Sequence, residues 1–474
     1  MALLPHLRKL AGQSAVYGSA DVFASLVNFL LLPVYTTYLS TTDYGHYALL
    51  LLFGAVAKIA FRLGLDAGFF RIHYDLEDAE ERRRLAGSVA LFTAAAGGAM
   101  LLAVAAASGP LTEQLLGPGL PRSWVVLVAA DVYLGGLAFV PASLLRIQDR
   151  PGTFSALSAA RHALNTVLKV ALVSRGHGIS GMVWSDVLAT GAYALFLLPI
   201  LLRHASPALS RPLLRQALGF GLPKVPHGIL VQVQNLADRK ILDLLDVARA
   251  EVGLYHVGYA FGTMVKFPLS AFEPAWQPFV YAQVKEKDAP LVLARVARYA
   301  FAAFAGAGLV VAVLGRELLV LMTARPEYHA AAPVIPVVAL AYVLHGVFLL
   351  TSVGIGIRKE ARYYPMVTAA AAATNLAANF ALIPAFGILG AAWATVLSYA
   401  VMAGAGFVVS RRLYPLPLEW PRLFAVAGAA GLVYAASLLA PSTLGPALAV
   451  KSALLLAYPA LLVSTGFLRE GNAL

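Results

Sequence analysis

Long apolar segments joined by short connections are the feature that most constrains the fold of this chain. A helix that crosses a bilayer needs about 20 mostly apolar residues. Segments of this kind fall at residues 14–39, 44–70, 85–108, 123–145, 152–174, 179–202, 219–245, 252–280, 291–314, 333–356, 364–386, 388–409, 422–440 and 447–468. Strands of an outer-membrane barrel alternate in polarity and do not produce such runs. The sequence therefore predicts an all-α polytopic membrane protein with about fourteen transmembrane helices.

Composition agrees with this fold class. Of the 474 residues, 60% are hydrophobic and 13% are charged, whereas soluble domains carry about 25% charged residues. The mean hydropathy is +0.75. The chain has no cysteine, which excludes disulfides and thiolate metal sites. Residues 1–18 lack the pattern of a cleavable signal peptide, so we expect the first span to be retained.

The basic residues are unevenly distributed among the connections between the predicted spans. Lys and Arg total 36 against 24 Asp and Glu, giving a net charge of +12. The basic residues gather in alternate connections, such as Arg82–Arg84, Arg203–Arg215 and Arg411–Arg422. Lys and Arg favour cytoplasmic loops, so the excess indicates topology rather than nucleic-acid binding. We expect a multi-pass protein of the cytoplasmic (inner) membrane with both termini in the cytoplasm.

Two stretches of the sequence recur at nearly one spacing. Phe53-Gly54-x-x-x-Lys58 returns as Phe261-Gly262-x-x-x-Lys266, and the pattern beginning Gly178-Ile179-x-Gly181-x-x-Trp184 returns as Gly387-Ile388-x-Gly390-x-x-Trp393. A shared Trp and a shared intramembrane Lys make chance an unlikely source of the match. The repeat predicts two related six-helix bundles that enter the membrane from the same side, a design found in transporters.

The repeat sets the expected domain boundaries. We predict an N-terminal six-helix bundle over 1–202, a cytoplasmic linker over 203–218 with Pro207 and Pro212, a C-terminal six-helix bundle over 219–412, and helices 13 and 14 over 413–474.

Charged residues inside the predicted spans need a partner, a cavity or a ligand. Lys58, Arg62 and Asp66 occur at four-residue steps, which places them on one helix face. The fifth span repeats this pattern with Arg161, Asn165 and Lys169. Cations outnumber acids within the spans, and cations in a low-dielectric cavity attract anions. The candidate residues of a cationic, anion-binding cavity are Lys58, Arg62, Arg161, Lys169, Lys266 and Arg239.

The repeat relates Lys58 to Lys266, and neither has an acid one helical turn away. We therefore expect them to face each other across a central cavity. Intramembrane carboxylates are candidates for binding a coupling ion, a proton or sodium: Asp66, Asp131, Asp186 and Glu273. Structural roles stay open at this point, since Arg62 and Asp66 can form an ion pair and Asp131 and Asp186 can pair within the bundle.

Several segments resemble a known family. They are 237–242 (ADRKIL), 251–255 (EVGLY), 275–279 (AWQPF), 383–395 (IPAFGILGAAWAT) and 414–420 (YPLPLEW). Their order and spacing resemble the polysaccharide transporter family of the multidrug/oligosaccharidyl-lipid/polysaccharide exporter superfamily. The resemblance implies a flippase that carries a polyprenyl-diphosphate-linked oligosaccharide, such as an O-antigen repeat unit for lipopolysaccharide, to the outer leaflet.

The resemblance also implies partners and a mechanism. The partners are the lipid-linked oligosaccharide, the bilayer and the polysaccharide polymerase machinery, with no cofactor or metal and no nucleic acid. In the related lipid II flippases the two extra helices are associated with a groove for the lipid tail. The expected mechanism is alternating access through the cationic cavity. Candidate sugar contacts are Tyr47, Tyr259, Trp276 and Asn165, although the aromatic residues are equally compatible with helix packing.

Three other functions are compatible with parts of the sequence. A lipid II flippase shares the expected fold and chemistry. A multidrug cation antiporter of the same superfamily would favour an acid-rich cavity and twelve helices. A membrane enzyme such as a sugar polymerase would need a sizeable outer loop, and the outer connections near 109–122 and 315–332 are short. No Walker loop or His-Glu-x-x-His motif occurs, so we predict that the chain is not an enzyme.

Overall fold

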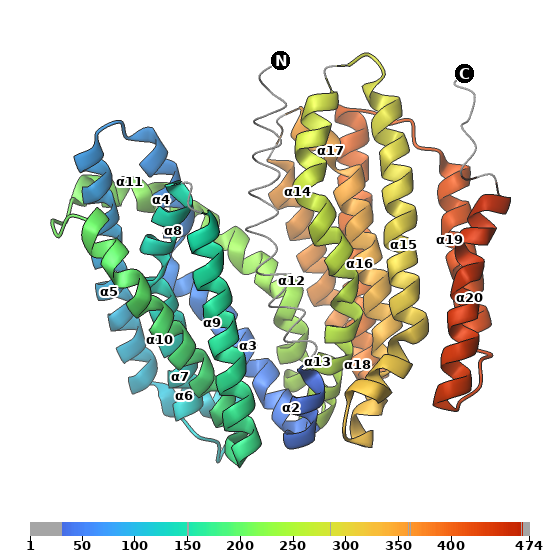
Figure 1. Ribbon diagram of the computed structural model, residues 1–474, viewed down its shortest axis with the longest axis horizontal. Helices are drawn as coiled ribbons and strands as arrows, with labels where there is room; N and C mark the ends of the chain where they lie inside the picture. The colour runs from blue at the N-terminus through green and yellow to red at the C-terminus, as the bar shows by residue number, and fades with distance from the viewer. Residues whose placement is uncertain are drawn as a thin grey trace. The chain divides into compact units, whose positions relative to one another are not determined.

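The computed structural model describes residues 31–148, 151–284, 286–358, 360, 362–465 and 467. These residues form helices joined by short connections, and no strand occurs in this part of the chain (Figure 1). The chain divides into two compact units, and the boundary falls within one helix, after Lys240. The predicted boundaries of the two bundles and of the linker stay predictions.

The first unit contains the helices up to Lys240. In chain order they are α2 (Leu32–Tyr38), α3 (Thr41–Arg62), α4 (Leu65–Asp75), α5 (Ala79–Ala106), α6 (Ser108–Leu116), α7 (Ser123–Leu137), α8 (Phe139–Ile147), α9 (Pro151–Leu172), η1 (Val173–His177), α10 (Gly178–His204), α11 (Arg211–Gly221), η2 (Leu222–Lys224) and most of α12 (Val225–Leu244). The helix α11 lies largely within the predicted cytoplasmic linker.

The second unit contains the helices from Ile241 onward. They are α13 (Arg249–Gly262), η3 (Thr263–Val265), α14 (Lys266–Gln283), α15 (Ala289–Met322), η4 (Pro326–Ala331), α16 (Val334–Thr351), α17 (Val353–Ile357), α18 (Tyr363–Leu413), α19 (Trp420–Ser437) and α20 (Leu444–Ser464). Within this unit α19 and α20 lie side by side and pack on α15 (Figure 1).

The helices agree with the predicted spans. Each predicted segment from the second to the fourteenth is helical, and eight helical stretches are long and apolar enough by themselves to cross a membrane. The first predicted span lies mostly outside the described residues, and only α2 covers its end. The prediction of an all-α polytopic membrane protein is therefore confirmed.

The second predicted span is broken into two helices, α3 and α4. It begins at a capping box, in which the Ser40 hydroxyl accepts from the amide of Asp43 and the Asp43 carboxylate accepts from the amide of Ser40. It is interrupted at Leu63 and Gly64, whose φ angles are 49° and 71°. A left-handed backbone ends an α-helix, so α3 stops at Arg62 and α4 starts again at Leu65.

A close helix contact accompanies this break. A side chain at Gly64 would place its Cβ 2.2 Å from the carbonyl oxygen of Gly221, and one at Gly68 would lie 2.1 Å from that of Ala217. Only glycine at positions 64 and 68 allows α4 and α11 to approach this closely.

The internal repeat is visible in the backbone. Gly178 and Gly387, which the repeated sequence places at corresponding positions, have φ and ψ angles of 52° and −134°, and 55° and −132°. Each glycine stands between two membrane-spanning halves, so α18 contains both the eleventh and the twelfth predicted spans. Trp184 and Trp393, six residues later, are 47% and 45% exposed. The backbone and the exposure thus match at these two pairs of positions, and that the two halves share a scaffold stays a prediction.

Candidate functional site

A polar cavity of about 380 Å³ lies within the first unit, among α3, α4, α7, α8, α9 and α10. Its charged and ionisable lining residues are Lys58, Arg62, Asp66, Asp131, Arg146, Arg161 and His162. Four of these are Lys or Arg and two are acids. The lining therefore carries an excess of positive charge in a part of the protein that the membrane surrounds, where unscreened cations attract anions strongly.

The break between α3 and α4 positions the first three of these residues. Lys58 and Arg62 lie in the last two turns of α3, and Asp66 lies in the first turn of α4. The Arg62 and Asp66 side chains remain within 3.8 Å of each other, as the four-residue spacing predicts. The guanidinium of Arg62 also lies 3.5 Å from the carbonyl oxygen of Gly135 and 5.5 Å from the centre of the Phe139 ring. These contacts hold Arg62 at the wall of the cavity.

The polar stripe of α9 is divided between two environments. Arg161 lines the cavity, with its guanidinium 5.6 Å from the centre of the Tyr193 ring. Lys169, two turns further along, is 7% exposed and forms an ion pair of 2.9 Å with Asp186 on α10. It also donates to the hydroxyl of Tyr47 at 3.4 Å. Asn165 donates to the same Asp186 carboxylate at 2.7 Å.

This second environment is a buried network that joins α3, α9 and α10. We call Tyr47, Asn165, Lys169 and Asp186 the lysine network. None of its members lines the cavity. Because the Lys169 and Asp186 charges neutralise each other, the network joins helices, and the anion-attracting charge is concentrated at the cavity.

Asp131 is an acid of the cavity lining with one unpaired carboxylate oxygen. It lines the cavity from α7, and its Oδ1 atom is buried without a hydrogen-bond partner among the described residues. Buried carboxylate oxygens are normally paired.

Arg146 is a cavity residue that sequence reasoning did not select. It lies in the last turn of α8. The alternation of basic residues along the sequence instead predicts that it belongs to a cytoplasmic connection. The structure places it in the cavity lining, with its guanidinium 4.2 Å from the centre of the Phe154 ring. A basic residue in the last turn of an apolar helix is a weak signal, because such residues commonly reach out to the membrane surface.

The remaining predicted residues lie elsewhere. Arg239 is 2% exposed and forms an ion pair of 2.5 Å with Asp238, and it does not line the cavity. In the second unit, Lys266 begins α14 and its ammonium lies 5.2 Å from the centre of the Tyr342 ring. The hydroxyl of Tyr342 is 3.1 Å from that of Tyr259, which is buried. That Lys58 and Lys266 face each other stays a prediction.

Glu273 and Trp276 line a separate pocket of about 230 Å³ within the second unit. Trp276 is 2% exposed, and its indole nitrogen donates to the carbonyl oxygen of Leu349 at 3.3 Å. Among the described residues, no group of three or more His, Asp or Glu side chains is arranged to hold a metal ion.

Comparison with solved structures identifies proteins with the same fold. Over 95% of this chain and 98% of the other, the fold is similar to that of the lipid II flippase MurJ in an inward closed conformation, with a TM-score of 0.77 and 10% sequence identity. It is also similar to a multidrug resistance MATE family transporter of the MOP superfamily in an inward-facing conformation, with a TM-score of 0.60, 15% identity and coverage of 88% and 99%. The chain therefore shares the fold of these two membrane transporters.

Sequence comparison defines the family. The sequence profile of the polysaccharide biosynthesis protein family matches residues 36–304, more than half of the chain. The chain belongs to this family. No curated protein sequence matches the chain. Family and fold together bear out the predicted relationship to polysaccharide transporters and the prediction that the chain is not an enzyme.

A third solved structure shows that pocket charge varies on this fold. It is a MOP superfamily transporter from Pyrococcus furiosus, in which the reverse polarity of the binding pocket suggests a different function. Its TM-score is 0.56, with 14% identity over 89% of this chain and 96% of its own. Function must therefore be argued from the site rather than from the fold.

Proposed function

We propose that this protein is a flippase that moves a polyprenyl-diphosphate-linked oligosaccharide, such as an O-antigen repeat unit, across the cytoplasmic membrane. The observation that carries the proposal is the cavity of the first unit, where Lys58, Arg62, Arg146 and Arg161 face only two acids. A diphosphate supplies the negative charge that such a lining attracts, and guanidinium groups bind phosphate oxygens with paired hydrogen bonds.

The helix break supports the same ligand class. Discontinuous helices commonly form the substrate sites of membrane transporters. Here the break at Leu63 and Gly64 lies between Arg62 and Asp66, which both line the cavity. In the proposed mechanism the diphosphate enters from the cytoplasm, these cations hold it, and movement of the two halves opens the site to the outer face while the lipid tail stays in the bilayer.

An apolar groove in the second unit suits the lipid tail. It has a volume of about 370 Å³ and lies among α15, α16, α18 and α19, and its lining includes Phe301, Leu344, Val347, Phe407, Leu423 and Phe424. We propose that the polyprenyl chain occupies this groove, which extends the role implied for the two additional helices.

A flipping assay tests the proposal. Purified protein is reconstituted into liposomes with a fluorescent short-chain lipid-diphosphate sugar in one leaflet, and exchange is followed for the wild type, Lys58→Glu and Lys266→Glu. We expect wild-type exchange and loss of exchange in both variants. Lys287→Glu, a charge reversal at an exposed residue outside both cavities, is the matched control and should exchange normally. Normal exchange by both test variants would refute the cavity mechanism.

A lipid II flippase is the second candidate, and the fold similarity to MurJ favours it. The same liposomes distinguish the two when they contain lipid II in place of the oligosaccharide lipid. Efflux of organic cations, with no exchange of any diphosphate lipid, would instead indicate a multidrug antiporter.

Energy coupling belongs to the same proposal. We choose Asp131 as the candidate carboxylate for a proton or sodium ion, because it lines the cationic cavity and its buried Oδ1 has no hydrogen-bond partner in the described structure. Imposed proton or sodium gradients should accelerate exchange by the wild type but not by Asp131→Asn. A rate that is unchanged by both gradients would remove the coupling proposal and leave the flippase proposal intact.

A further inference from the structure

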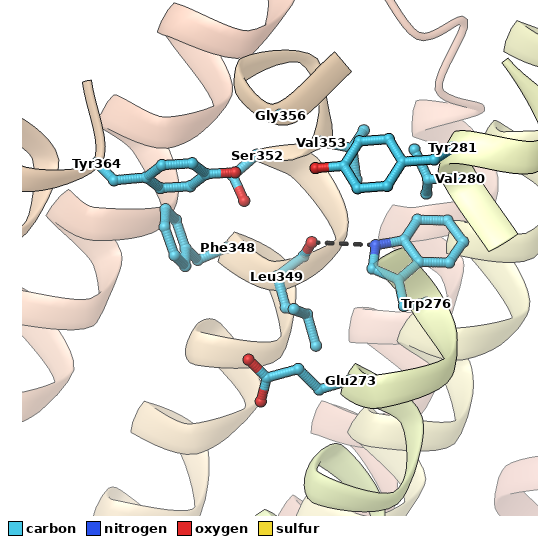
Figure 2. A pocket seen from close by; sticks show the side chains of 10 residues that line it. All are labelled: Glu273, Trp276, Val280, Tyr281, Phe348, Leu349, Ser352, Val353, Gly356 and Tyr364. Atoms are coloured by element: carbon cyan, nitrogen blue, oxygen red, sulfur yellow. Dashed lines mark hydrogen bonds between the residues drawn. The ribbon is translucent and has the colours of Figure 1, made fainter. Parts of the chain in front are cut away.

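The pocket of the second unit combines aromatic rings with free polar groups (Figure 2). Phe348 supplies a ring surface, and Trp276, which is stacked with Phe272 and Phe279, forms part of the wall. Tyr281 and Tyr364 approach from opposite sides with their hydroxyls directed toward one another near Ser352. Glu273 lies at the other end of the pocket. The lining comes from α14, α16, α17 and α18 and from Ser352 between α16 and α17, all within one unit.

The polar groups of this pocket are not used by the fold. The carboxylate of Glu273 and the side-chain hydroxyls of Tyr281, Tyr364 and Ser352 make no hydrogen bond or ion pair with another residue in the described ranges. Trp276 differs, because its indole N–H is already bound to Leu349. Trp276 therefore supports the wall, while the other four groups remain available to a ligand.

A glycine makes the convergence of the two tyrosines possible. A Cβ atom at Gly356 would lie 2.7 Å from the Tyr281 hydroxyl oxygen and 3.5 Å from that of Tyr364. Any larger residue would displace the Tyr281 hydroxyl from this position. The two tyrosine hydroxyls therefore border an open volume that no side chain fills.

This combination matches a sugar ring. Tyrosine and serine hydroxyls both donate and accept hydrogen bonds, and a carboxylate accepts two, which suits adjacent sugar hydroxyls. The less polar face of a sugar ring can pack against aromatic surface. A small number of polar groups in a partly aromatic concavity is typical of a small-molecule site, and about 230 Å³ accommodates one monosaccharide.

The position of Lys266 adds a second argument. Lys266 and Glu273 lie seven residues apart on α14, which places them on one helix face about 10 Å apart along the axis. A phosphate beside Lys266 would leave its attached sugar within reach of the pocket.

We infer that this pocket binds one sugar residue of the lipid-linked oligosaccharide, with Glu273, Tyr281, Tyr364 and Ser352 as its hydrogen-bonding groups. The inference rests on the proposed flippase function and adds a sugar subsite to it. Of the four predicted sugar contacts, Trp276 lines this pocket as part of its wall, and the other three do not line it.

Equilibrium binding tests the subsite. The full-length protein in lipid nanodiscs is titrated with farnesyl diphosphate and with farnesyl diphosphates that carry glucose, galactose or N-acetylglucosamine. We expect at least one sugar-bearing probe to bind about tenfold more tightly than the sugar-free probe. Tyr364→Phe and Glu273→Gln, which preserve side-chain shape, should remove that difference and leave the affinity for farnesyl diphosphate unchanged. Tyr363→Phe, at the adjacent position outside the pocket lining, is the matched control.

The outcomes separate the two proposals. Equal affinity for all probes, or equal weakening of all probes by the pocket variants, would overturn the sugar subsite while leaving diphosphate recognition in place. Failure of the wild type to bind farnesyl diphosphate at all would overturn the proposed function itself. Binding of tetraphenylphosphonium that depends on Glu273 would reassign the pocket to organic cations.

Discussion

The cavity of the first unit and the pocket of the second unit lie on related helices and differ in chemistry. The repeat that aligns Lys58 with Lys266 also aligns Arg62 with Ser270 and Asp66 with Pro274. Likewise Arg161, Asn165 and Lys169 correspond to Ala370, Thr374 and Ala378. The second half has kept one lysine of the polar stripes and has placed aromatic residues and a single acid in its own pocket.

This difference shows which properties the repeated scaffold preserves. The backbone at Gly178 and Gly387 and the exposure of Trp184 and Trp393 are nearly the same in the two halves. The two glycine turns and the two exposed tryptophans are therefore alike in the two halves, while the residues that line the cavities differ. On the proposed function, the first half supplies the charge for the diphosphate and the second half supplies contacts for the sugar.

The largest expected effect comes from inverting the charge of the first cavity. Lys58→Glu combined with Arg161→Glu changes its lining from four cations and two acids to two cations and four acids. We expect exchange of the diphosphate lipid to fall to the rate of protein-free liposomes, because an acid-rich cavity repels the diphosphate. Thermal unfolding should remain close to the wild type. Appreciable exchange by this variant would contradict the proposal that the positive charge of the first cavity binds the diphosphate.

The next effect concerns the lysine network, which the second half lacks. Lys169→Met leaves the Asp186 carboxylate without its buried cation, and removal of one partner of a buried ion pair costs about 3–5 kcal/mol. We expect a large fall in the unfolding temperature, measured in detergent. Adding Asp186→Asn to this variant should recover part of the loss. Wild-type stability for Lys169→Met alone would contradict a structural role.

A smaller effect tests the shared backbone. Gly178→Ala and Gly387→Ala should each destabilise the protein by about 1–3 kcal/mol, because residues with a side chain rarely adopt this conformation. Neither substitution meets a closer obstacle than a Glu251 oxygen, 3.8 Å from the Cβ at Gly387. The two losses should therefore be similar. Gly428→Ala, in an open helical position, should show no loss, and a large difference between the two test variants would break the proposed equivalence.

The smallest effect is expected at the two exposed tryptophans. Trp184→Leu and Trp393→Leu keep an apolar side chain at positions that are about half exposed, so each should change the free energy of unfolding by less than about 0.5 kcal/mol. Thermal unfolding of both variants measures this change. A substantial loss at only one of them would show that its ring has a function that the repeat does not share.

The order of the spans from the second to the fourteenth, and much of the polar stripe of α3, could be predicted from the sequence. Apolar length is a local property, because a membrane requires each span to satisfy its own backbone hydrogen bonds. The four-residue spacing of Lys58, Arg62 and Asp66 is local too, and it correctly placed these three side chains together. The repeat could be read because glycine and tryptophan at fixed spacing are rare enough to be recognised.

How these side chains are shared between sites depends on the packing of the helices. Lys169 lies on the same predicted face as Arg161, yet Asp186 and Tyr47 from two other helices draw it into the lysine network. Arg146 joins the cavity from a helix end, and Tyr364 reaches Gly356 only because α17 and α18 pack together. Such pairings depend on how helices distant in sequence pack, and the periodicity of one helix carries no information about its neighbours.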